Sequence, residues 1–124
     1  MRTTIFAARD GRVALDVAER PGWEPLGEYD GKPLEGVRLM VVERLPLGEI
    51  QLVEIAAGGH FAMHASSDVA FCQVVRGRGK LGLPGGTEIS YEAPELYVFH
   101  PGALHDWHDV KEDTLLSVCL VRAG

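Results

Sequence analysis

Glycine and proline interrupt this chain so regularly that little room is left for helices. The 15 glycines and 7 prolines separate short apolar runs that are rich in β-branched residues. Such runs, bounded by turn residues at nearly even spacing, are typical of a sandwich or barrel rather than of a helical bundle. We therefore predict an all-β fold of about eight or nine short antiparallel strands. The clearest candidates are residues 37–45, 49–56, 69–75, 87–91, 95–99, 104–110 and 114–121.

The end of the chain leaves one alternative open. Residues 115–121 are apolar on both faces, so periodicity alone fits either a buried helix or a buried strand. Their short length and the strands expected beside them favour a strand. Residues 21–36, which are dense in glycine and proline, are predicted to form a loop.

Size and charge limit the class of protein. The chain has 124 residues and a formal net charge of −6, which predicts one domain that binds neither nucleic acid nor anionic membranes. No stretch approaches the ~18 apolar residues of a membrane helix, and the N-terminus lacks a signal-peptide core. Cys72 and Cys119 form no CxxC pair, so we expect reduced thiols and a cytoplasmic location.

Two familiar patterns occur without the context that they need. Gly77, Gly79 and Gly82 match the GxGxxG of dinucleotide-binding sites, but the following Leu-Pro-Gly-Gly cannot begin the required helix. His60 and His64 have the spacing of a zinc-protease helix, but Phe61 stands where HExxH has Glu. Neither pattern predicts a site.

Five histidines form two groups, with His60 and His64 in one and His100, His105 and His108 in the other. Because side chains alternate along a strand, we expect His105 and Trp107 on one face and His108 on the other. Neutral imidazoles from the two groups, brought together, suit a transition metal. The alternative is that each histidine is a surface or hydrogen-bonded core residue.

Two segments resemble the two motifs of the cupin superfamily. Residues 64–79 resemble the first motif, His-x-His followed by Glu and Gly, with Gly77 at the glycine position. Residues 101–109 resemble the second, Pro-x-Gly-x-x-His-x-x-x-Asn, with His105 at the histidine position. The resemblance covers about residues 37–121 and implies an antiparallel double-stranded β-helix, or jelly-roll barrel. Residues 37–124 would form the barrel, and the strands and loop of residues 1–36 would pack on it.

The departures from the cupin motifs concern its metal ligands. His64 and His105 keep two of the four ligand positions, whereas Ser66 replaces the second histidine and Ala70 replaces the glutamate. Asp109 stands at the position of the asparagine. A divalent Fe, Mn, Ni, Cu or Zn ion would therefore need a further protein ligand.

Three residues are candidates for that third ligand. His60 is the first choice, because a regular strand places it on the same face as His64. Asp68 would need a β-bulge to turn inward, and Asp109 lies one pleat beyond His105.

The resemblance leads to two hypotheses about function. Beside the two histidines, the predicted lining of the barrel interior is Ser66, Ala70, Cys72 and Trp107. Serine and alanine are smaller than the family's ligands, so we expect a cavity that binds a small polar molecule without any need for catalysis. The alternative is a metal-dependent enzyme (a dioxygenase, isomerase or lyase) that uses His64 and His105 as ligands. Exposed sheet edges, together with the strand candidates at residues 3–6 and 12–18, predict a homodimer.

Overall fold

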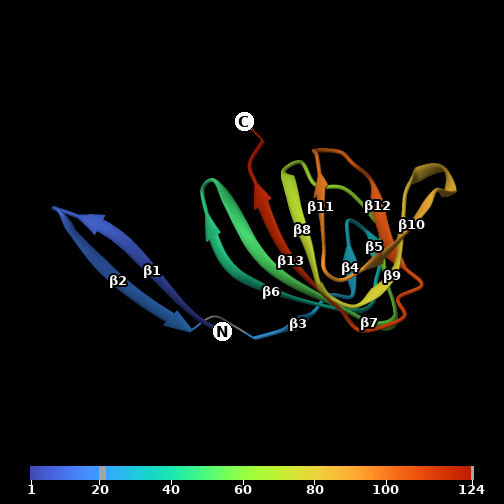
Figure 1. Cartoon of the computed structure of the whole chain (residues 1–124), viewed down its shortest axis with the longest axis horizontal. Helices are drawn as coiled ribbons and strands as arrows, with labels where there is room; N and C mark the ends of the chain where they lie inside the picture. Colours follow the sequence, from blue (N-terminus) through green and yellow to red (C-terminus); the bar gives the residue numbers. More distant parts are fainter. Residues whose placement is uncertain (20–21, 124) are drawn as a thin grey trace.

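The protein is an antiparallel β-barrel with a separate N-terminal hairpin, as seen in a computed structural model that describes residues 1–19 and 22–123 (Figure 1). The strands are β1 (Arg2–Arg9), β2 (Arg12–Glu19), β3 (Glu24–Pro25), β4 (Glu28–Tyr29), β5 (Lys32–Pro33), β6 (Glu35–Leu45), β7 (Gly48–His64), β8 (Val69–Arg76), β9 (Arg78–Gly82), β10 (Glu88–Glu92), β11 (Glu95–Phe99), β12 (His105–His108) and β13 (Thr114–Val121). The prediction of an all-β jelly-roll barrel is confirmed.

Helical structure is confined, among the described residues, to one 3₁₀ turn at Pro84–Gly86. Residues 115–121, for which the pattern left a helix open, form the strand β13 between β7 and β8. In the described part of the chain, no helix is long and apolar enough to cross a membrane.

The barrel sheet is built around one long strand. Its hydrogen-bonded order is β10-β9-β12-β7-β13-β8-β11, and β6 pairs with the free side of β7. The first half of β7 pairs with β6 and β13, and its last residues pair with β12. β7 turns at Gly58, whose φ of 79° is in the left-handed region that glycine adopts without strain. One strand thus contributes to both walls of the barrel.

The core lies between these walls. Tyr91, Ile55, Leu81 and Val74 are fully buried there, and the Tyr91 hydroxyl is 2.7 Å from Oγ1 of the buried Thr114. This contact satisfies two hydroxyl groups that are buried away from water. None of these five side chains lines the cavity described below.

The GxGxxG pattern reflects close packing between strands. Gly77 has a φ of 104°, and a Cβ there would lie 2.5 Å from Thr114 Oγ1. A Cβ at Gly82 would lie 2.4 Å from the carboxylate of Asp106 on the neighbouring strand. Both glycines therefore leave room for a neighbouring strand rather than for a phosphate.

The N-terminal region has two parts. Residues 24–36 lie on the barrel, where β3 pairs with β6 and Leu34 is buried in the core. Strands β1 and β2 instead pair with each other across Asp10 and Gly11, both in the left-handed region, and form their own two-stranded sheet. Figure 1 shows this hairpin extending away from the barrel. The hairpin is thus paired through its own turn, whereas residues 24–36 are paired to the barrel.

Candidate functional site

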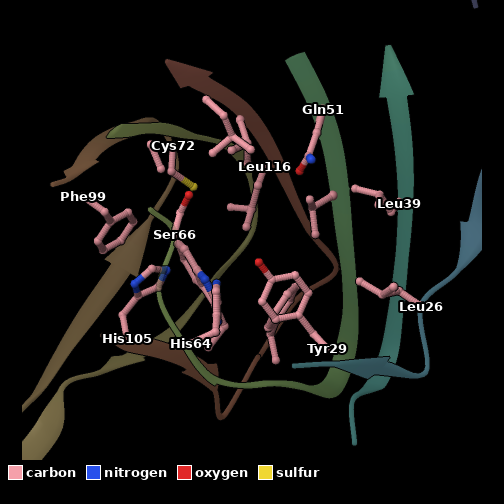
Figure 2. Close-up of a pocket in the computed structure, with 16 residues that line it drawn as sticks. Leu26, Tyr29, Leu39, Gln51, His64, Ser66, Cys72, Phe99, His105 and Leu116 are labelled. Carbon is pink, nitrogen blue, oxygen red and sulfur yellow. The ribbon is translucent and has the colours of Figure 1, made fainter. Parts of the chain in front are cut away.

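The two histidines of the cupin-like motifs are directly opposite each other. His64 ends β7, His105 begins β12, and the two residues are register partners. Their ring centroids are 4.4 Å apart with an interplanar angle of 57°. Figure 2 shows both imidazoles inside the barrel, beside Ser66 and Phe99. The structure thus brings together the pair on which the site hypothesis depends.

Main-chain carbonyls define which ring nitrogens are free. His64 Nδ1 lies 2.8 Å from the carbonyl oxygen of Ala62, and His105 Nδ1 lies 3.0 Å from that of Ala103. A carbonyl only accepts, so each Nδ1 carries the proton and donates it. The Nε2 atom of each neutral ring therefore keeps its lone pair.

Burial keeps both rings neutral. It lowers the pKa of His105 to about 4, and the neighbouring His64 adds to this effect. Burial also lowers the pKa of His64, with a smaller contribution in the same direction from Lys32. The pair is therefore uncharged at neutral pH and offers two hydrogen-bond acceptors.

Aromatic side chains hold the pair on both sides. Phe99 stacks on His105 with centroids 3.6 Å apart and an interplanar angle of 9°. Phe61 is 4.2 Å from the His64 ring, and Tyr29 approaches that ring edge-on at 5.3 Å. Trp107, which is 2% exposed, contacts His105 edge-on. The rings are thus confined, and confinement of this kind preorganises a binding site.

These side chains border a cavity of about 210 Å³ inside the barrel. Its walls are mostly aliphatic and aromatic, and its polar groups are few. The lining residues are Leu26, Tyr29, Leu39, Gln51, Val53, Phe61, His64, Ser66, Ala70, Cys72, Phe99, His105, Trp107, Leu116, Val118 and Leu120.

All four residues predicted to line the pocket do so. Ser66, Ala70, Cys72 and Trp107 face the cavity together with the two histidines. The Ser66 hydroxyl accepts a 3.0 Å hydrogen bond from the main-chain N–H of Asp68. Burial raises the pKa of the Cys72 thiol to about 12, so the thiol stays protonated at neutral pH and packs as a small apolar wall residue.

His60, the first choice for a third metal ligand, does not line the cavity. The register between β7 and β12 runs from His64↔His105 to Phe61↔Trp107, so the two β7 residues in between oppose a single residue of β12. This β-bulge reverses the alternation. Phe61 therefore points inward, and His60 lies on the opposite face.

The other two candidate ligands are also directed elsewhere. Asp68 lies 3.6 Å from Arg122, and the exposed Asp109 forms a 2.9 Å ion pair with Lys111. Neither residue lines the cavity. The inward turn considered for Asp68 does not occur, because the bulge lies in β7 and not beside it.

The donor set does not fit a tightly held metal ion. The cavity offers two imidazole Nε2 atoms, and no carboxylate is among its lining residues. Among the described residues, no three His, Cys, Asp or Glu side chains form a group that could hold a metal. With two protein ligands, most of the coordination shell would be left to water.

The remaining histidines lie outside the cavity. His100 is exposed. His108 lies between two carboxylates, with Nδ1 2.5 Å from Asp106 and Nε2 2.8 Å from Glu88. The hydrogen bond to Asp106 raises the pKa of His108, and Glu88 contributes in the same direction.

Several lining residues were not predicted from the sequence. Tyr29 and Leu26 come from the N-terminal loop region, which had been assigned to packing alone. Phe99 was not among the residues predicted to line the cavity, but it stacks on His105. Phe99 lies two residues before the second cupin-like motif, and this position was an available signal.

Comparison with known proteins supports the fold. No family model matches the chain, and no curated protein matches it. Among solved structures, a cupin 2 conserved barrel domain protein from Rhodopseudomonas palustris is similar, with a TM-score of 0.68 and 20% identity over 97% of this chain and 81% of that one.

Two further solved structures are similar over a smaller share of this chain. KdgF from Halomonas sp. has a TM-score of 0.65 and 15% identity over 83% of this chain and 90% of that one. The polyketide cyclase RemF from Streptomyces resistomycificus has a TM-score of 0.62 and 16% identity over 70% of this chain and 66% of that one. The chain therefore has the cupin fold.

Proposed function

We propose that this protein binds a small, flat, mostly apolar molecule in its barrel through a hydroxyl or N–H group that donates to His64 and His105. The observation that carries this proposal is the pair of neutral imidazoles, with both Nδ1 atoms engaged, inside an otherwise apolar cavity. We therefore expect the polar group of the ligand to lie only at the end that contacts the two histidines.

The walls and the volume support a ligand of one or two rings. An apolar cavity of about 150 Å³ is large enough for benzene, whereas sites for drug-sized ligands are about 300–1,000 Å³. The cavity of about 210 Å³ lies between these sizes. Tyr29, Phe61 and Trp107 present ring faces and edges against which a flat molecule packs well.

The hydrogen-bonding chemistry supports a donor on that ligand. Each Nε2 atom has a lone pair and no proton, so it accepts from O–H or N–H and repels a carboxylate. A buried acceptor without a partner is costly, which favours ligands that donate to it. A phenol or an indole meets both requirements.

Matched probe molecules test this proposal. We expect 2-naphthol to bind more tightly than 2-methoxynaphthalene, which has the same rings and no donor, by about 2- to 12-fold for one net hydrogen bond. Isothermal titration calorimetry would measure both. In His64→Phe and His105→Phe, the preference for naphthol should shrink while ring binding persists.

A control lies on the same strand. His108→Gln changes a histidine outside the cavity and should leave both affinities unchanged. Equal affinities for the two probes in the wild-type protein would contradict the proposal, as would a preference that survives in the His64→Phe/His105→Phe double variant.

The metal-dependent enzyme is the second candidate, since structures with this fold include the cyclase RemF and a predicted oxalate decarboxylase from Thermotoga maritima. Its ligands would be His64 and His105, and its reaction a dioxygenation, isomerisation or elimination. Elemental analysis of protein purified without a His-tag separates the candidates. We expect less than one metal ion per chain, and a full equivalent that disappears in His64→Phe would favour the enzyme.

A variant that adds the missing ligands tests whether their absence is what weakens metal binding. Ser66 and Ala70 both line the cavity at the positions of the missing cupin ligands. We expect Ser66→His/Ala70→Glu to bind Zn²⁺ or Mn²⁺ at least ten times more tightly than the wild type, because four donors then converge. Unchanged metal affinity in a folded variant would show that the missing donors do not limit binding.

A further inference from the structure

The N-terminal hairpin carries an apolar face that no other described residue of its own chain covers. Register pairs place Phe6 opposite Leu15, with Val17 and Val13 on the same face. These four side chains are 57–68% exposed. Within residues 1–19 and 22–123, β1 and β2 pair only with each other. An isolated two-stranded hairpin is at best marginally stable in water, so this face needs a surface on which to pack.

The barrel exposes an apolar surface of its own. One row of register partners crosses four strands, from β7 through β13 and β8 to β11, and its side chains point away from the cavity. Its members are Ile50, Cys119, Phe71 and Val98. Leu96, which is 60% exposed, extends the row along β11. Exposed apolar surface of this extent on a small domain marks an interaction site.

Charge points to the same pairing. The hairpin has three arginines and three acidic residues within residues 1–19, so the net charge of −6 resides on the rest of the chain. Arg9 and Arg12 are register partners beside the turn, and neither is ion-paired to a described residue. Two arginines opposite each other repel unless a carboxylate lies near. The barrel of a second copy is acidic and therefore supplies carboxylates for these arginines. Because the hairpin has no net charge, an acidic barrel does not repel it.

We propose that the hairpin face formed by Phe6, Val13, Leu15 and Val17 packs on the outer row Ile50, Cys119, Phe71 and Val98 of a second copy of this chain. Because each copy has one hairpin and one outer row, a two-fold arrangement buries both pairs of surfaces and closes the assembly. Figure 1 shows the hairpin reaching well outside its own barrel, as such an exchange requires.

Light scattering at micromolar concentration tests this assembly. We expect twice the chain mass of 13.5 kDa for the wild type. Phe6→Ser/Leu15→Ser and Phe71→Ser/Val98→Ser should each give the mass of a single chain, since all four side chains are exposed in the isolated fold. The near-UV circular dichroism of the buried Trp107 would report that both variants keep the barrel.

Two matched controls come from apolar residues that lie elsewhere. Ile5→Ser lies on the other face of the hairpin, and Ile89→Ser lies on β10 in the other wall. Both should remain dimeric. A wild-type protein with the mass of one chain would overturn the proposal, and so would a dimer that persists in Phe6→Ser/Leu15→Ser.

Cross-linking identifies the surfaces themselves. Leu15→Cys should form a disulfide with Cys119 of the second copy on mild oxidation and give a covalent dimer. Asp16→Cys, on the opposite hairpin face, and Leu15→Cys/Cys119→Ser should not. A Leu15→Cys disulfide closed within one chain, shown by intact mass, would mean that the hairpin folds onto its own barrel and would overturn the exchange.

Discussion

His105 and His108 lie on the same four-residue strand, yet the protein treats them in opposite ways. His105 faces the cavity, is 5% exposed, and has its pKa lowered to about 4 by burial. His108 faces outward between Asp106 and Glu88, and the hydrogen bond to Asp106 raises its pKa. The difference shows that the face of the strand, and not the residue type, decides which form of histidine the protein stabilises.

The largest expected effect concerns acid stability. The unfolded chain protonates His105 near its ordinary pKa of 6.5, but the folded chain does so only near 4. Unfolding is therefore favoured as the pH falls from 6.5 to 4, by about 3 kcal/mol at 1.36 kcal/mol per pH unit.

Replacing His105 should remove this dependence. We expect His105→Phe to gain about 3 kcal/mol relative to the wild type between pH 7 and pH 4, whatever its stability at pH 7. Urea unfolding at several pH values would measure the difference. Parallel pH dependences for the two proteins would show that His105 is not held neutral.

The next effect concerns ligand affinity. A donor binds only to a neutral Nε2 atom, so the affinity for 2-naphthol should be constant from pH 8 to pH 6 and fall about tenfold per pH unit once the solution is more acidic than the folded pKa of about 4. Fluorescence titration of the naphthol would follow this change. An affinity that already falls around pH 6.5 would mean that the two rings titrate like exposed histidines.

The smallest effect has the opposite sign. Since the pKa of His108 is raised, its ion pairs stabilise the fold below pH 6.5, and this contribution is lost as the pH rises through the raised value. We expect His108→Gln to cost less than about 1 kcal/mol at pH 6 and nothing at pH 9, because His108 is only partly buried and solvent screens its ion pairs. A larger loss at pH 9 than at pH 6 would contradict this assignment.

The fold could be predicted because its signals are local. Turn residues separate the strands, and period-2 alternation correctly places His105 and Trp107 inward and His108 outward. The pairing of His64 with His105 also followed from the two motifs. In each case a short stretch of sequence contains the information that decides the outcome.

The parts of the site that were missed depend on pairing between distant segments. The bulge between Phe61 and His64 arises from the pairing of β7 with β12, which has one residue fewer over the same stretch. The sequence of β7 alone does not indicate it. Tyr29 reaches the cavity only because residues 24–36 fold back over the barrel. The local pattern of a strand cannot contain either fact.

The absence of a side chain at Gly82 has an evolutionary consequence. A methyl group there would occupy the space of the Asp106 carboxylate, which is also the first partner of His108. Selection on residue 82 would then act through the pKa of His108, because a side chain there displaces the carboxylate that binds this histidine. Drift from glycine to alanine at that position would then be registered as lost stability in mild acid, where the Asp106 carboxylate stabilises protonated His108.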